Sequence, residues 1–105
     1  EFDTPNPQGA YGKTKLAGEN MVKDFADRYM IFRTAWLYGD GRNFVKTMLR
    51  LAENGDKVRV VEDQVGSPTS ARELARAITS QLFTDNYGLF HATCEGNCSW
   101  ADFAR

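Results

Sequence analysis

Apolar residues recur along this chain at two alternating spacings, which predicts helices separated by strands. Helical spacing (i, i+3, i+4, i+7) predicts three helices, at about residues 8–28, 44–54 and 70–82. Runs of β-branched and aromatic residues predict three strands, at residues 29–36, 58–61 and 88–92. A further helix is predicted to begin near residue 99. This alternation is typical of an α/β fold assembled from βαβ units.

Polar, glycine and proline residues mark where these elements should begin and end. Asn6 is predicted to cap the first helix, with Pro7 in its first position, and Ser70 is predicted to cap the third. The second helix should stop near Gly55. Residues 39–41 and 64–69 are predicted to be loops.

Composition and charge narrow the function classes. Hydrophobic residues make up 42 % of the chain, which predicts a packed domain rather than disorder. The net charge of -1 gives no electrostatic case for a nucleic-acid partner or a membrane. No apolar run approaches the roughly 20 residues of a spanning helix. Residues 1–8 are acidic and proline-rich, unlike a signal peptide, so a cytoplasmic location is expected.

The cysteines and the single histidine do not form a recognisable metal or nucleophile motif. Cys94 and Cys98 have C-x3-C spacing with His91 nearby, but a structural zinc site needs a fourth ligand. We expect two reduced thiols, no metal, and a packed or solvated His91.

Tyr11 and Lys15 are four residues apart on the first predicted helix, which places them on one face. A phenol is a weak acid at neutral pH, and a neighbouring ammonium favours its ionised form, so the pair can serve general acid–base catalysis. On spacing alone, an aromatic ring packed on a lysine stem is the commoner meaning.

Longer sequence segments favour the catalytic interpretation of Tyr11 and Lys15 over simple packing. PQGAYGKTKLAGE at residues 7–19 and RTAWLYG at 33–39 resemble the active-site helix and following strand of extended short-chain dehydrogenases/reductases. DQVGSPT at 63–69, strongly specific at this distance, resembles one subfamily, the dTDP-4-dehydrorhamnose reductases. Three further segments continue the likeness in order: NFVKTM at 43–48, GLFHA at 88–92 and SWADF at 99–103.

The resemblance implies part of a Rossmann-like doubly wound fold. Residues 1–105 would form a single unit, with the active-site helix, the later βα units and the substrate-binding region. The N-terminal dinucleotide-binding half, with its glycine-rich loop and the Ser/Thr that binds the substrate carbonyl, would lie outside it. The chain reads as starting in a loop and stopping within a helix. We therefore expect a fragment that is inactive alone.

The resemblance also implies catalytic and cofactor roles. Tyr11 would be the general acid that protonates the C4 oxygen while NADPH or NADH delivers hydride to C4. Lys15 would hold the nicotinamide ribose and favour the ionised form of Tyr11. Thr34 and Ala35 would lie near the nicotinamide, so all four residues would contact the cofactor.

On the substrate side, the resemblance implies that Trp36 lines the sugar pocket, although a core tryptophan is an equal alternative. Gln64, Pro68 and Thr69 would shape the same side. Glu73 falls where some relatives hold a metal at a dimer interface. Here we expect an ordinary surface glutamate, because no companion ligand is visible.

The implied reaction is reduction of dTDP-4-dehydro-L-rhamnose to dTDP-L-rhamnose, with a homodimer as one expected assembly. Two alternatives remain open. One is an epimerase or dehydratase acting on another nucleotide sugar. The other is a non-catalytic regulator similar to the β subunit of methionine adenosyltransferase. The presence of both Tyr11 and Lys15 favours an enzyme.

Overall fold

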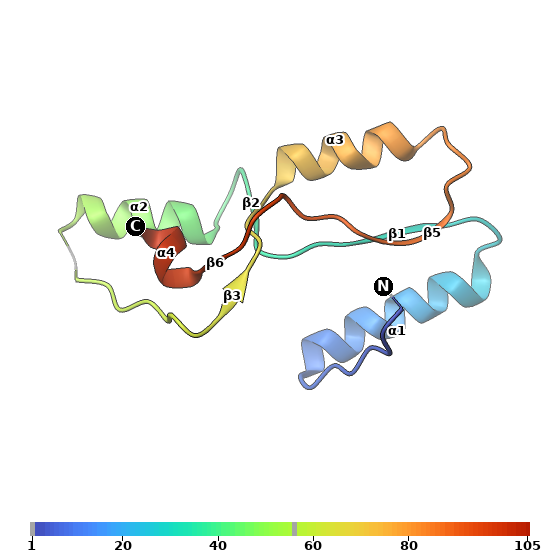
Figure 1. Ribbon diagram of the computed structural model, residues 1–105, viewed down its shortest axis with the longest axis horizontal. Helices are drawn as coiled ribbons and strands as arrows, with labels where there is room; N and C mark the ends of the chain where they lie inside the picture. Colours follow the sequence, from blue (N-terminus) through green and yellow to red (C-terminus); the bar gives the residue numbers. More distant parts are fainter. Residues whose placement is uncertain (1, 56) are drawn as a thin grey trace.

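A computed structural model describes residues 2–55 and 57–105, so Glu1 and Asp56, at the predicted opening loop and near the predicted end of the second helix, lie outside the described residues. Helices and short strands alternate along the chain (Figure 1). In chain order the elements are α1 (Ala10–Phe25), β1 (Met30–Arg33), β2 (Leu37–Tyr38), α2 (Phe44–Glu53), β3 (Val65–Gly66), β4 (Thr69–Ser70), α3 (Ala71–Gln81), β5 (Gly88–His91), β6 (Cys98–Ser99) and α4 (Trp100–Ala104).

Strands β1 and β5 form the parallel pair around which one end of the chain is arranged. Their register places Met30 opposite Gly88 and Arg33 opposite His91. On this pair the rings of Phe32 and Phe90 stack with centroids 5.7 Å apart. Helices α1 and α3 flank the pair on its two sides (Figure 1). A parallel pair with helices on both faces is the arrangement of a doubly wound α/β fold.

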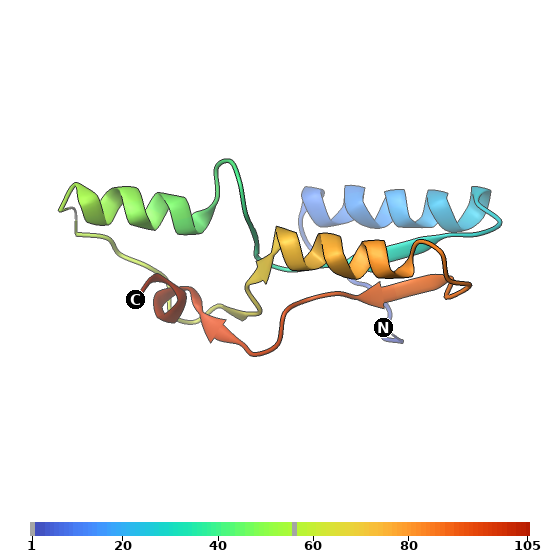
Figure 2. The same ribbon diagram turned by 90° about the horizontal axis from the view of Figure 1, so that it is seen from above.

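The segment predicted as a loop at residues 64–69 instead contributes two short strands. Strand β4 pairs in parallel with β2, and β3 pairs antiparallel with β6. These pairs bring the segment against the chain that follows β1 and against the start of α4 (Figure 2). The prediction of a loop was wrong because both partners are distant in sequence.

Other boundaries also differ from the predictions. Helix α1 begins at Ala10 with Gly9 as its N-cap, so Asn6 does not cap it. Pro7 instead lies against the helix, where a Cβ on Gly12 would come within 2.9 Å of the proline Cβ. Ser70 is the N-cap of α3, but its side chain makes no capping hydrogen bond.

The predicted strand at residues 58–61 is not a strand in the structure. Its backbone has no strand partner among the described residues, and Val58 and Val61 are 42 % and 51 % exposed. The carbonyl of Val61 accepts a hydrogen bond from the amide of Ala101 at 3.1 Å, which joins this segment to α4. Residues 58–61 therefore form an irregular segment, because strand propensity does not produce a strand without a neighbouring strand to pair with.

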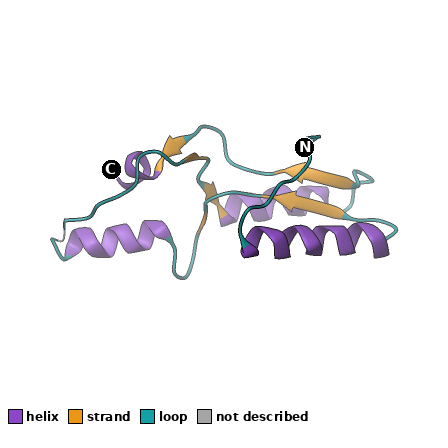
Figure 3. Ribbon diagram, turned by 90° about the horizontal axis from the view of Figure 1, so that it is seen from below, coloured by secondary structure: helices purple, strands orange, loops and turns teal. Residues whose placement is uncertain are grey.

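The described residues are spread along one long axis rather than gathered around a core (Figure 3). The Cα radius of gyration is 16.5 Å, against about 13 Å for a compact domain of 100 residues. No hydrophobic side chain among the described residues is buried, whereas the polar Thr69 and Ser99 are only 1 % and 4 % exposed. Helices with apolar stripes therefore leave much of that surface uncovered. No described helix has the length and apolar character to cross a membrane.

Candidate active site

Tyr11 and Lys15 lie on successive turns at the N-terminal end of α1. The Nζ atom of Lys15 is 5.5 Å from the centroid of the Tyr11 ring, which confirms the predicted pairing on one face. Tyr11 is 76 % exposed. The phenol is thus open to a ligand and has a cation over its ring.

Glu19 continues the same face of α1 and pairs with Arg33 at the end of β1. The Nε and Nη2 atoms of Arg33 donate to the two carboxylate oxygens of Glu19 at 2.8 and 2.6 Å. The hydrogen bond from Arg33 lowers the pKa of Glu19, and the same bond raises the pKa of Arg33. Two parallel charge-assisted bonds fix orientation as well as distance. They attach the helix that carries Tyr11 and Lys15 to the strand beside it.

Thr34 and Ala35 follow the carboxyl end of β1. Thr34 is exposed and Ala35 is half-buried. The amide of Ala92 donates to the carbonyl of Arg33 at 2.8 Å, so contact with the β5 side continues to the end of the strand. The N-terminal end of α1 and the carboxyl end of β1 lie at the same end of the β1–β5 pair (Figures 1 and 2). Ligands of doubly wound folds bind outside this edge.

Trp36 comes next and is held on several sides. It is the only described non-glycine residue with a positive φ, 46°. Its carbonyl accepts a hydrogen bond from the amide of Thr69 at 3.1 Å. Its ring stacks on Trp100, with centroids 3.6 Å apart and an interplanar angle of 12°. The side chain is half-buried, so part of the residue stays accessible.

The predicted substrate-side residues Gln64, Pro68 and Thr69 adopt different environments. Gln64 is exposed, and its carbonyl accepts a hydrogen bond from the amide of Trp100 at 3.3 Å. Pro68 is half-buried. Thr69 is only 1 % exposed, and its hydroxyl donates to the carbonyl of Ser67 at 3.1 Å. Thr69 is therefore a buried residue whose hydroxyl stabilises the backbone at Ser67 and does not face solvent.

The site residues thus form two groups. The first joins α1 to β1, and the second joins Trp36, three residues beyond the end of β1, to the 64–69 segment and α4. Glu19, Arg33, Gly66 and Trp100 belong to these groups, although sequence reasoning assigned them no role. The one available signal was that Glu19 lies four residues after Lys15, on the face that carries Tyr11.

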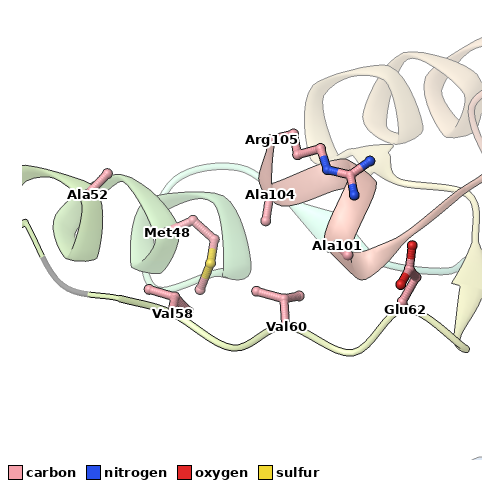
Figure 4. A pocket seen from close by; sticks show the side chains of 8 residues that line it. All are labelled: Met48, Ala52, Val58, Val60, Glu62, Ala101, Ala104 and Arg105. Carbon is pink, nitrogen blue, oxygen red and sulfur yellow. The ribbon is translucent and has the colours of Figure 1, made fainter.

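Two hollows bear on where a ligand could enter. An open hollow of about 320 Å³ lies beside Lys15 and includes Gly12, Glu19 and Arg33 in its wall. A cavity of about 450 Å³ lies elsewhere, between α2, the 58–62 segment and α4 (Figure 4). Its lining residues are Met48, Ala52, Val58, Val60, Glu62, Ala101, Ala104 and Arg105. None of these is a predicted site residue, so this cavity lies apart from the candidate site, whereas the hollow beside Lys15 is part of it.

The candidate metal ligands considered from the sequence are His91, Cys94, Cys98 and Glu73. The described residues contain no group of three or more His, Cys, Asp or Glu side chains arranged to hold a metal ion. Cys94 and Cys98 are free thiols. Glu73 forms an exposed ion pair with Arg76 at 2.8 Å, one turn away on α3.

Comparisons with known proteins agree with the fold. The family profile described as "RmlD substrate binding domain" matches residues 1–105. The spore coat polysaccharide biosynthesis protein SpsK of Bacillus subtilis is 45 % identical over 105 residues, which cover 99 % of this chain and 37 % of SpsK.

Two solved structures superimpose closely. A dTDP-4-dehydrorhamnose reductase of Clostridium acetobutylicum has a TM-score of 0.96 and 60 % identity, over 99 % of this chain and 37 % of that one. The enzyme of the same name from Bacillus anthracis, solved in complex with NADP, has a TM-score of 0.96 and 47 % identity, over 99 % and 38 %. These likenesses confirm the predicted α/β, Rossmann-like fold. The chain spans about 37 % of the length of such relatives.

Proposed function

The chain belongs to the RmlD substrate-binding-domain family, and from this premise we propose that it supplies the catalytic helix and sugar-side elements of a reductase for nucleotide-linked 4-keto sugars. The observation that carries the proposal is the Tyr11–Lys15 pair, with the ammonium 5.5 Å from the ring centroid of an exposed phenol. The proposed substrate is dTDP-4-dehydro-L-rhamnose and the product dTDP-L-rhamnose.

Tyr11 is the proposed general acid. Its hydroxyl gives a proton to the C4 oxygen of the sugar, and solvent later restores that proton. Lys15 keeps a positive charge beside the phenol, which favours the phenolate that remains after transfer. General acid–base catalysis of this kind contributes typically about 10²- to 10⁴-fold.

The residues beside Lys15 fit a nicotinamide ribose. The open hollow of about 320 Å³ has the lysine in its wall, and an ammonium offers three hydrogen-bond donors to sugar hydroxyls. Thr34 adds an exposed hydroxyl, and Ala35 a small side chain, after the carboxyl end of β1. When bound, a reduced nicotinamide supplies the hydride to C4. The NADP complex of the Bacillus anthracis relative favours NADPH over NADH.

On the substrate side, we propose that Trp36 offers its accessible surface to the sugar, with Gln64 and Pro68 at the edge of the pocket. Buried Thr69 holds this edge in place through the backbone pairing of β2 with β4. A planar aromatic ring gives a sugar a rigid, largely apolar surface.

The open shape supports the proposal that residues 1–105 act as one unit of a longer polypeptide. Large apolar side chains on α1 are uncovered, including Phe25, which is 83 % exposed, and Met21, which is 60 % exposed. The rest of a relative-sized chain would cover such faces. The proposal includes a cytoplasmic location, where Cys94 and Cys98 remain thiols, and a homodimer as one assembly.

The test uses the full-length protein that carries residues 1–105, NADPH deuterated at the transferred position, and dTDP-4-dehydro-L-rhamnose. Consumption of NADPH, with deuterium found by NMR at C4 of the product, is the expected result. Exchange at other ring carbons without net NADPH consumption would instead indicate an epimerase. Sugar-nucleotide or cofactor binding without turnover would favour the non-catalytic alternative and contradict the proposal.

A further inference from the structure

We infer that Gly66 and Trp100 are positioning residues that hold the Trp36 indole in one orientation toward the sugar. This inference rests on the proposed function, because it concerns the aromatic residue proposed to face the substrate. Neither residue needs to touch the substrate for this role. Three independent observations around Trp36 carry the inference.

The first observation is the backbone of Trp36. A φ of 46° lies in the left-handed region, which bulky L-residues rarely adopt. Such a conformation persists only where the surrounding structure fixes it, and it occurs often at ligand sites. Here the hydrogen bond from the buried Thr69 fixes the carbonyl of Trp36, directly before the β2–β4 pairing begins. The side chain therefore leaves the backbone in a direction that an extended strand would not give it.

The second observation is the missing side chain at position 66. A Cβ on Gly66 would lie 2.5 Å from Cε2 of the Trp36 indole and 2.8 Å from both Cζ2 and Nε1. Gly66 does not have a positive φ, so its backbone conformation does not require glycine. Glycine is needed because the indole lies directly against the backbone of β3.

The third observation is the stacking partner. Trp100 lies nearly parallel to Trp36 at 3.6 Å. Its own position is set by a capping box in which the Ser99 hydroxyl accepts a hydrogen bond from the Asp102 amide at 3.0 Å. The amide of Trp100 also donates to the carbonyl of Gln64. Since β3 pairs with β6, directly before α4, Gly66 and Trp100 belong to one local unit.

A ring held in this way has little rotational freedom left to lose when a sugar binds, so its contribution to binding is preorganised. Disturbing Gly66 or Trp100 should therefore raise the KM for the sugar nucleotide and leave the KM for NADPH nearly unchanged. A merely structural role would instead reduce stability and affect both ligands together.

The first test is spectroscopic and does not depend on turnover. Two stacked indoles couple their transitions, so the full-length protein should show an exciton couplet in circular dichroism that Trp36→Phe removes. Trp100→Phe should remove the couplet as well, because it takes away the other indole, and Gly66→Ala, which keeps both indoles, should reduce it by about half or more. Val65→Ala is the matched control, because Val65 is in the same strand and 64 % exposed, and should leave the couplet intact. A couplet unchanged in Gly66→Ala would overturn the inference.

The second test is a double-mutant cycle on the KM for the sugar nucleotide. Gly66→Ala should raise this KM on the order of tenfold in the wild-type background, the effect expected of directly contacting residues. It should change the KM little in the Trp36→Phe background, since phenylalanine lacks the fused second ring and is too small to bring its atoms as close to position 66 as Cε2, Cζ2 and Nε1 of the indole. Equal effects in both backgrounds would overturn the inference. If the wild-type protein shows the couplet but does not reduce the sugar, only the proposed function is refuted. The effect of Gly66→Ala on the couplet would still decide whether Gly66 positions the Trp36 indole.

Discussion

The guanidinium of Arg33 donates two hydrogen bonds to the carboxylate of Glu19, at 2.6 and 2.8 Å, across the space between α1 and β1. The two side chains are 28 % and 16 % exposed, so the pair is only partly screened by solvent. Glu19 lies one turn after Lys15, and Arg33 directly precedes Thr34. This ion pair therefore fixes the position of the helix that carries Tyr11 and Lys15 relative to the end of the strand that precedes Thr34 and Ala35.

Replacing Glu19 with Gln should destabilise the full-length protein by about 1 to 3 kcal/mol at pH 7, since it removes the charge from a partly buried, doubly hydrogen-bonded pair. Arg33 lowers the pKa of Glu19 in the folded state. Its stabilising contribution is therefore fully present above the ordinary carboxyl pKa of about 4 and is lost as the pH falls through the lower folded value. Urea unfolding of both proteins from pH 7 to pH 2 measures this.

The matched control is Glu73→Gln, which removes the carboxylate from the exposed Glu73–Arg76 pair on α3. Exposed helix pairs three or four residues apart contribute about 0.2 to 0.5 kcal/mol, so its effect should be small at every pH. If the difference between wild type and Glu19→Gln persisted at the acid end, the ion pair would not be its source.

The sequence was sufficient for features that depend on neighbouring residues. The 3.6-residue period located α1, α2 and α3, and i, i+4 spacing placed Lys15 beside Tyr11. It was insufficient where a distant partner decides the outcome. Among the described residues, the strand-like run at 58–61 has no strand to pair with, whereas the polar 64–69 segment pairs with two strands.

The same dependence on distant partners explains why two contacts at the candidate site were not predicted from the sequence. The contact of Gly66 with Trp36 and the pairing of Glu19 with Arg33 join residues that are 30 and 14 positions apart. Neither follows from local spacing. The predicted strand ran through Trp36, but the strand ends at Arg33, and three residues later the backbone turns into the left-handed region at Trp36.

Residues 1–105 expressed alone should be catalytically inactive and should self-associate. No described hydrophobic side chain is fully buried, and large apolar residues such as Phe25 and Phe83 are 83 % and 95 % exposed. Uncovered apolar surface of this kind drives association. Size-exclusion chromatography should show oligomers, and a nicotinamide titration followed by tryptophan fluorescence should show no saturation. A monomer that binds NADPH tightly would contradict this expectation.

Trp36→Ala in the full-length protein should weaken sugar-nucleotide binding much more than NADPH binding. Truncating an aromatic anchor of a binding site costs about 2 kcal/mol, which corresponds to roughly thirtyfold in Kd. Isothermal titration with each ligand separates the two effects. Phe83→Ala is the control, because this ring is exposed beyond the end of α3. Equal losses for both ligands would assign Trp36 a packing role.

The central claim is that Tyr11 donates the proton to the sugar, and a comparison of two tyrosines tests it most directly. Tyr87 also has a cation over its ring, with the Arg28 guanidinium 5.7 Å from the centroid, but it directly precedes the amino end of the β1–β5 pair, away from the carboxyl end where the candidate site lies. The measurement is kcat for NADPH-dependent reduction of dTDP-4-dehydro-L-rhamnose by full-length wild type, Tyr11→Phe and Tyr87→Phe. We expect Tyr11→Phe to lose about 10²- to 10⁴-fold and Tyr87→Phe to stay within about twofold of wild type. A Tyr11→Phe protein that kept most of its kcat would contradict the account.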